Sequence, residues 1–239
     1  MAQSSIERTE VTWNPVTWCT QISEWCKNCY ALRMSKRLQA MWLEKYKDGF
    51  KLRIHPEALD FPSKLKKPSM IFVNSMSDLF HKDVPTSFIF DVFSVMNREK
   101  KHIFQVLTKR PERVLELNKQ LKRTRNIWMW TSVENQKVSD RINLLSKTSA
   151  KIKFISAEPL LWDLCNLNLK KIDRLIVWWE SWPKARPMML ERVENIKNQC
   201  RKHSTAFFFK QWWWVNKKNT GRVLNGEIYN EYPAWYSPC

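Results

Sequence analysis

The sequence predicts an α/β protein built from parallel β/α repeats, arranged as a partial or complete barrel of the TIM type. Short runs of β-branched and aromatic residues alternate with segments of helical periodicity. Several runs are almost entirely apolar, which is typical of strands buried on both faces of a parallel sheet. Six or so such units in 239 residues fit a barrel. A doubly wound open sheet is the alternative.

Each element is assigned from its own pattern. The predicted strands are residues 70–74, 103–107, 127–133, 152–156, 175–177 and 206–210. Apolar residues spaced three and four apart predict amphipathic helices over residues 31–41, 114–121, 138–145 and 190–200, and a more apolar helix covers 88–96. We find no linker, repeat or low-complexity stretch. We therefore predict one domain over residues 1–239, with a polar C-terminal appendage from about residue 217 to 239.

Composition narrows the function classes. Apolar residues make up 44% of the chain, and the net charge is +18, which favours a polyanionic partner, nucleic acid first. The lysines are spread along the chain, so a lysine-rich surface without such a partner is the alternative. No apolar run is long enough to span a membrane, and MAQSSIERTE at the start has no secretion signal. We expect a cytoplasmic protein, with its need for a partner protein and its oligomeric state left open.

Three closely spaced cysteines are the sharpest chemical signal. Cys26 and Cys29 are two residues apart, and Cys19 precedes them by a six-residue loop. In a cytosolic chain such a cluster indicates a metal site rather than disulfides. Zinc with a fourth ligand elsewhere is one option, and an iron–sulfur cluster with one open iron is the other. The α/β context favours the open cluster.

Polar residues follow all six predicted strands. Carboxyl ends of parallel strands meet at one edge of a sheet, where such folds place their chemistry. We therefore expect a shared pocket there. Its candidate catalytic residues are Asp78, Lys109, Arg110, Glu134, Glu158 and Lys210, and Asn74 is a candidate cofactor contact. A hydrolase using Asp78, His81 and Glu158 is a weaker alternative, because no nucleophile motif accompanies them.

Several blocks of the chain, in order, resemble one known family. They include TWNPVTWCTQISEWCKNCYA, KKPSMIFVNSMSDLFHKDVP, HIFQVLTKRPER, FISAEPLL and ESWPKARPM. The family is a phage-associated and bacterial one of unknown function, named after phage gene products thirty-seven and sixty-eight, and it looks like a relative of radical S-adenosylmethionine enzymes. The resemblance implies a barrel and a 4Fe-4S cluster on Cys19, Cys26 and Cys29, with S-adenosylmethionine at the open iron. It also makes Glu180 and Ser181 candidate cofactor contacts.

This resemblance implies an iron–sulfur enzyme, and the net charge of +18 suggests nucleic acid as its substrate. The alternative is a non-catalytic nucleic-acid-binding protein with structural zinc on the same cysteines. One departure concerns the cysteines, because six residues separate the first two where the commonest radical-enzyme spacing has three.

A second departure concerns glycine. The chain has 3 glycines and 14 tryptophans, whereas average usage predicts roughly 17 glycines. Ten tryptophans stand where the family tends to have glycine: Trp18, Trp25, Trp42, Trp130, Trp162, Trp178, Trp179, Trp182, Trp213 and Trp214. We hypothesise that these are UGA codons read as tryptophan in place of glycine. A real aromatic surface for stacking bases is the alternative. UGG codons at all ten positions in the gene would refute the recoding.

Overall fold

The computed structural model describes residues 11–23, 26–27, 29–46, 51–160, 162–178, 189–212 and 221–236. Its main feature is a parallel sheet of seven strands in the order β1-β4-β5-β6-β7-β8-β9. The strands are β1 (Val11–Trp13), β4 (Met70–Val73), β5 (Ile103–Thr108), β6 (Ile127–Ser132), β7 (Ile152–Ala157), β8 (Arg174–Val177) and β9 (Ala206–Phe209). The α/β prediction is confirmed. The sequential order is that of a β/α barrel wall, without the reversal of a doubly wound sheet.

The contact pattern divides the chain into two compact units. Unit 1 comprises residues 1–129 and 148–151, and unit 2 comprises residues 130–147 and 152–239. Because the division falls within β6, both units draw on this strand. The sequence-based description of one domain stays a prediction. Among the described residues, no helix is long and apolar enough to cross a membrane.

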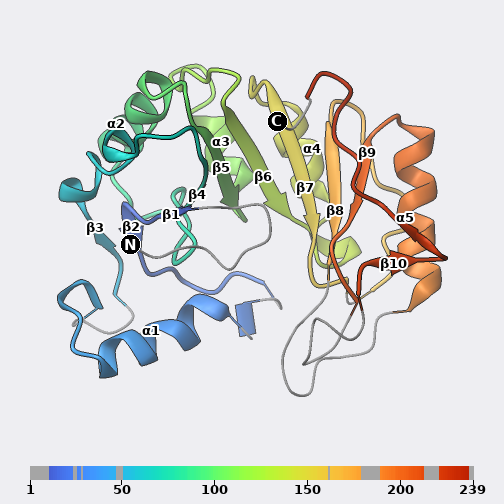
Figure 1. Cartoon of the computed structure of the whole chain (residues 1–239), viewed down its shortest axis with the longest axis horizontal. Helices are drawn as coiled ribbons and strands as arrows, with labels where there is room; N and C mark the ends of the chain where they lie inside the picture. Colours follow the sequence, from blue (N-terminus) through green and yellow to red (C-terminus); the bar gives the residue numbers. More distant parts are fainter. Residues whose placement is uncertain are drawn as a thin grey trace. The chain divides into compact units, whose positions relative to one another are not determined.

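Unit 1 is built on β1, β4 and β5, which pair in parallel register (Figure 1). Its helices are α1 (Tyr30–Ala40), α2 (Thr86–Arg98) and α3 (Pro111–Glu116), with short 3-10 turns η2 (Glu44–Tyr46), η3 (Pro56–Ala58) and η4 (Pro62–Lys64). A small antiparallel ladder joins β2 (Val16–Thr17) to β3 (Arg53–Ile54). The sequence pattern missed β1, because three residues are too few for a periodicity.

Unit 2 is built on β7, β8 and β9, again in parallel register. Its helices are α4 (Asp140–Ser146), which contacts β7, and α5 (Leu190–Lys202), which packs against β9 (Figure 1). The turn η5 (Gln136–Val138) precedes α4, and β10 (Val223–Leu224) pairs with β11 (Glu227–Ile228) in a C-terminal hairpin. Directly after this hairpin, Asn230 forms an antiparallel bridge with Phe208 of β9. The C-terminal segment therefore covers part of an otherwise open strand edge.

Two of the tryptophans that the recoding hypothesis assigns to glycine have left-handed backbone. Trp18 has φ 76° and Trp42 has φ 54°, a region that glycine adopts without strain. Trp42 follows α1, where its N–H donates a hydrogen bond to the Gln39 carbonyl. The Leu43 N–H donates to the Leu38 carbonyl. This is the Schellman pattern, whose left-handed position is most often glycine. The backbone at residue 42 therefore has the geometry that the glycine hypothesis requires.

Candidate metal and cofactor site

The three cysteines lie on the segment that connects β2 to α1 in unit 1. Cys19 follows β2, Cys26 is buried in a 3-10 turn, and Cys29 precedes the first residue of α1. None of the three is in a disulfide. The segment is anchored next to Cys19, because the Trp18 N–H donates to the carbonyl of Met76, in the loop after β4. The cysteines therefore belong to the same unit as the carboxyl ends of β4 and β5.

Asp78 organises the polar residues at this edge. Its Oδ1 accepts hydrogen bonds from the Phe80 N–H (3.0 Å) and the Thr108 hydroxyl (2.8 Å). Its Oδ2 accepts from the Lys109 N–H (3.0 Å) and from Arg110 Nη1 (3.0 Å). An ionised carboxylate offers about four acceptor positions, and all are used. The geometry therefore gives Asp78, predicted as a catalytic candidate, a positioning role.

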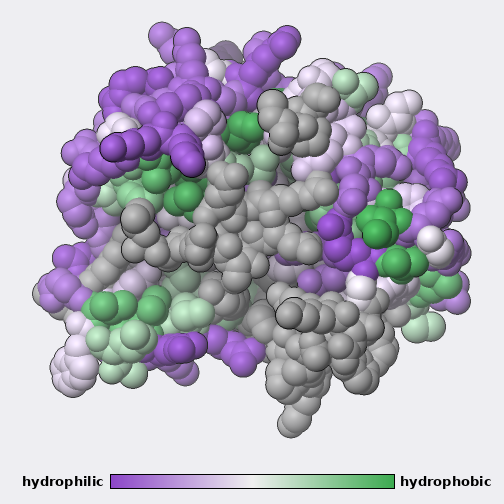
Figure 2. All heavy atoms as spheres, viewed as in Figure 1, coloured by the Kyte–Doolittle hydropathy of each residue, from purple (hydrophilic) through white to green (hydrophobic). Residues whose placement is uncertain are grey.

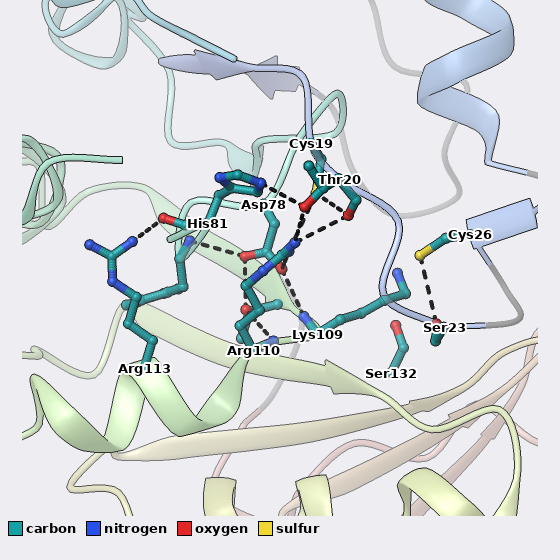
Figure 3. A network of polar contacts seen from close by, with 12 residues as sticks. Cys19, Thr20, Ser23, Cys26, Asp78, His81, Lys109, Arg110, Arg113 and Ser132 are labelled. Atoms are coloured by element: carbon teal, nitrogen blue, oxygen red, sulfur yellow. Dashed lines mark hydrogen bonds and ion pairs between the residues drawn. The ribbon is translucent and has the colours of Figure 1, made fainter. Parts of the chain in front are cut away.

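Arg110 connects Asp78 to the cysteine segment (Figure 3). Its Nη1 donates to the Cys19 Sγ at 3.3 Å, and its Nη2 donates to the carbonyl and hydroxyl oxygens of Thr20, both at 3.1 Å. The residue sits at the N-cap of α3, where Pro111 begins the helix. Since proline favours the first helical position, the strand turns abruptly at Arg110. This turn aims the guanidinium at the loop of Cys19.

Electrostatics distinguish the first two cysteines. Burial and the negative charge of Asp78 raise the pKa of Cys19, although Arg110 and Lys109 oppose this shift. Burial alone would also raise the pKa of Cys26, but Lys109 and hydrogen bonds from Ile22 and Ser23 outweigh it and lower the pKa. Lys109 therefore acts electrostatically on both sulfurs. A cation in this place stabilises thiolates.

His81 closes the other side of the network. Its Nε2 lies 2.8 Å from the Thr20 hydroxyl, and its Nδ1 accepts from the Asp83 N–H at 3.2 Å. With Nδ1 as acceptor, the neutral ring donates from Nε2 to Thr20. Burial and the nearby Arg110 lower the pKa of His81. The neutral imidazole therefore supports the loop of Cys19.

The donor set at the cysteine segment fits a thiolate-ligated metal. Three sulfurs come from one segment, and Cys29 lies at the helix N-terminus of α1, where the helix dipole favours a thiolate. As the side chains lie in this structure, the described residues contain no group of three or more His, Cys, Asp or Glu arranged around a single metal position. Cys19 contacts Arg110, and Cys26 lies 3.6 Å from the Ser23 hydroxyl. Binding therefore requires the sulfurs to turn toward one another.

Asn74, the predicted cofactor contact at the end of β4, has a structural function in this fold. It is buried with φ 59°, and its Oδ1 accepts from the Val16 N–H at 3.1 Å. Its own N–H donates to the Trp13 carbonyl at 2.8 Å. These bonds attach the chain after β1 to the end of β4. The Asn74 Nδ2 is buried and has no hydrogen-bond partner among the described residues.

The other predicted catalytic residues lie in unit 2. Glu134 is fully buried and pairs with Arg141 (3.1 Å), while its Oε1 has no hydrogen-bond partner among the described residues. Glu158 accepts from the Ser156 hydroxyl at 3.1 Å. The Lys210 ammonium stands over the Trp178 ring, 3.2 Å from its centre.

The remaining predicted contacts, Glu180 and Ser181, lie outside the described residues. The structure thus gathers Asp78, Lys109 and Arg110 with Cys19 in unit 1, while Glu134, Glu158 and Lys210 belong to unit 2.

The candidate residues taken from the sequence leave out three participants. Thr20 accepts from Arg110, and Thr108 both donates to Asp78 and accepts from the Arg110 N–H (2.9 Å). Arg113, on α3, donates to the carbonyls of His81 and Val84. The Arg110–Arg113 spacing, one helical turn after a strand, was the available signal. Thr20 carried no signal beyond its position next to Cys19.

Comparison with known families covers nearly the whole chain. A family model described as "Protein of unknown function (DUF5131)" matches residues 3–233. The chain belongs to this family. The match includes the cysteine segment and both units. No curated protein and no solved structure matches the chain.

Proposed function

We propose that the chain is an iron–sulfur protein of the radical S-adenosylmethionine type, holding a 4Fe-4S cluster on Cys19, Cys26 and Cys29 and acting on nucleic acid. The observation that carries this proposal is that three cysteines without disulfides lie on one segment, beside the carboxyl ends of β4 and β5. When bound, such a cluster supplies one-electron reduction of S-adenosylmethionine at its open iron. We also propose that the protein is cytoplasmic and phage-related.

The surrounding residues suit a negatively charged metal centre. Arg110 already donates to the Cys19 Sγ, and Lys109 lowers the pKa of Cys26. These cations offset the charge of the thiolates. Asp78 holds both residues at the ends of β5 and α3, because it accepts from the Lys109 N–H and the Arg110 guanidinium. We assign Asp78 and Arg110 to positioning the Cys19 loop.

Anaerobic reconstitution of the full chain with iron and sulfide tests the proposal. We expect a brown protein with thiolate-to-iron charge-transfer absorbance, which cleaves S-adenosylmethionine after reduction. Cys19→Ser, Cys26→Ser and Cys29→Ser should each abolish or greatly reduce the absorbance. Cys165→Ser, at an exposed cysteine of unit 2, is the matched control and should leave it unchanged. A colourless protein that binds zinc tightly through the same three cysteines would favour structural zinc and overturn the proposal.

A further inference from the structure

The amino-terminal edge of unit 1 has a strongly one-sided charge. Four segments enter strands at this edge: residues 62–69 before β4, 100–102 before β5, 117–126 before β6 and 148–151 before β7. None of the four contains Asp or Glu. Together they carry these exposed basic residues: Lys64, Lys66, Lys67, Lys100, Lys101, Lys119, Lys122, Arg125 and Lys151. We call this surface the basic edge.

Hydrogen bonds join the first three segments into one surface. The Ser69 N–H donates to His102 Nδ1 (3.2 Å), and His102 Nε2 lies 3.0 Å from the Pro62 carbonyl. The Asn126 amide in turn donates to the His102 carbonyl (3.1 Å), and the Phe104 N–H donates to the Asn126 carbonyl (2.7 Å). The buried residues of these segments therefore fix the positions from which the lysines project.

The fourth segment is attached through Arg123. This buried guanidinium donates to the Asn118 Oδ1 (3.0 Å) and to the Ser149 hydroxyl (2.9 Å). The Asn118 Oδ1 also accepts from the Ser149 N–H at 2.8 Å. Residues 148–151 thus lie against residues 117–126. In Figures 1 and 2, hydrophilic side chains line the side of unit 1 where β5 and β6 begin.

The charge of the basic edge is not neutralised within the described part of the chain. No described Asp or Glu forms an ion pair with any of its nine basic residues, whereas nearby Glu99 pairs with Arg98. Lysines that are far apart in the sequence meet here because parallel strands bring all their entry segments to one side. A surface of this kind attracts a polyanion.

The composition of the basic edge selects among polyanions. Its four segments contain no Phe, Tyr or Trp, whereas single-stranded nucleic acids are usually bound on aromatic stacking platforms. They also contain none of the exposed large hydrophobic residues of the described chain, so they lack the apolar anchor of an amphipathic membrane-surface site. The contacts that the basic edge can still make are those of its lysines and arginine with phosphate groups. We propose that the basic edge binds the phosphate backbone of a double-stranded nucleic acid, without reading its sequence.

The dimensions of the edge agree with a duplex. Three strand spacings of about 4.8 Å place the outer entry segments roughly 14 Å apart. This is close to the approximately 12 Å width of the DNA major groove. Lysine side chains at both ends can therefore reach phosphates on either side of one groove.

This inference rests on the nucleic-acid part of the proposed function and does not need the cluster. A six-residue strand such as β5 separates its two ends by roughly 17 Å, so the basic edge is distinct from the edge of Cys19. Duplex binding is expected without S-adenosylmethionine. A brown protein that fails to bind a duplex would overturn this inference alone, and a colourless one that binds would overturn the cluster alone.

Fluorescence anisotropy with a duplex of about 20 base pairs, roughly two helical turns, tests the proposal over a range of salt concentrations. The variant replaces four residues of the basic edge: Lys66→Gln, Lys67→Gln, Lys122→Gln and Arg125→Gln. The matched control removes the same charge from exposed positions of unit 2: Lys137→Gln, Lys170→Gln, Arg201→Gln and Lys202→Gln. Urea unfolding of all three proteins checks that the fold is retained.

We expect the edge variant to raise the Kd at least about tenfold near 0.1 M salt. The slope of the logarithm of the association constant against log salt is negative, and the variant should make it shallower by about 3 to 4. The control should keep a slope close to that of the unmodified chain. An equal loss in both variants would show that total charge alone drives binding and would overturn the proposal. So would absence of duplex binding at low salt, or binding through these residues to phosphatidylserine vesicles in place of the duplex.

Discussion

Two buried carboxylate–arginine pairs, one in each unit, differ in how completely they are satisfied. In unit 1, Asp78 and Arg110 are 3.0 Å apart, and every acceptor position of the carboxylate is used. In unit 2, Glu134 and Arg141 are 3.1 Å apart, but Glu134 Oε1 has no hydrogen-bond partner among the described residues. A buried acceptor without a partner is costly unless something donates to it. The first pair therefore organises loops, whereas the second leaves one carboxylate oxygen without a partner among the described residues.

The strongest way to break this comparison is to remove the arginine of the satisfied pair. Arg110→Met leaves Asp78 charged and buried, since both side chains are 8% exposed, and also removes the donor to Cys19. We expect the free energy of unfolding to fall by about 3 to 5 kcal/mol, measured by urea denaturation. Arg98→Met, which removes an arginine 60% exposed and paired with Glu99, is the control and should cost at most about 1 kcal/mol. Equal losses in the two variants would refute the organising role.

Amide substitutions compare the two carboxylates directly. Asp78→Asn presents an amide NH2 to backbone N–H donors, so we expect a loss of about 3 kcal/mol in the free energy of unfolding. Glu134→Gln can keep its oxygen on Arg141 and place its NH2 where Oε1 now lacks a partner. We expect a loss of about 1 kcal/mol for this change. Urea unfolding of both variants measures the difference, and an equal or inverted order would mean that Glu134 is as fully bonded as Asp78.

How much of this site the sequence predicts depends on the range of the interaction. The sequence shows local features directly. Among them are the spacing of Cys19, Cys26 and Cys29 and the polar residue after each predicted strand. Three of the four bonds to Asp78 are different, because those from Thr108, Lys109 and Arg110 require β4 and β5 to be neighbours in a particular register. No periodicity along the chain contains that information.

The basic edge illustrates the same limit. In the sequence, Lys66, Lys100, Lys122 and Lys151 are separated by more than twenty residues each and look like dispersed charge. Strand order alone brings their segments together. The sequence could assign the predicted strand ends to one edge of a sheet, because all parallel strands end at the same edge. It could not divide them between unit 1 and unit 2, because that division depends on the strand order.

Trp42→Gly tests whether unit 1 loses stability after any substitution or only when a buried charge loses its partner. Trp42 is 94% exposed with φ 54°, so glycine removes a backbone strain of about 1 to 2 kcal/mol and loses little packing. Its greater freedom in the unfolded chain offsets part of that gain. We expect a net stabilisation of about 0.5 to 1 kcal/mol by urea unfolding.

Trp18→Gly is the contrasting variant, because Trp18 is 1% exposed and packs edge-on against Tyr46, with ring centres 5.5 Å apart. The cavity left by the indole should cost about 3 to 5 kcal/mol, more than the relief of strain returns. If Trp42→Gly destabilised the chain, the left-handed strain at residue 42 would be refuted.

The smallest expected effect is a difference in acid sensitivity between the units. His102, in unit 1, accepts from the Ser69 N–H at Nδ1 and lies against the Pro62 carbonyl through Nε2, which requires the neutral ring. Burial lowers its pKa below the usual 6.5. The unfolded chain therefore takes up the proton first as the pH falls, so stability is full above about pH 6.5 and declines toward the lowered folded pKa.

Urea unfolding between about pH 7.5 and 5.5 measures this decline, and His102→Gln should reduce it because glutamine does not titrate. His203→Gln, at an exposed histidine of unit 2, is the control and should keep the pH dependence of the unmodified chain. His81, whose pKa burial also lowers, should add to this decline, and it too belongs to unit 1. A pH dependence that His102→Gln leaves unchanged, while His203→Gln removes it, would assign the acid-sensitive group to unit 2 and reverse the comparison.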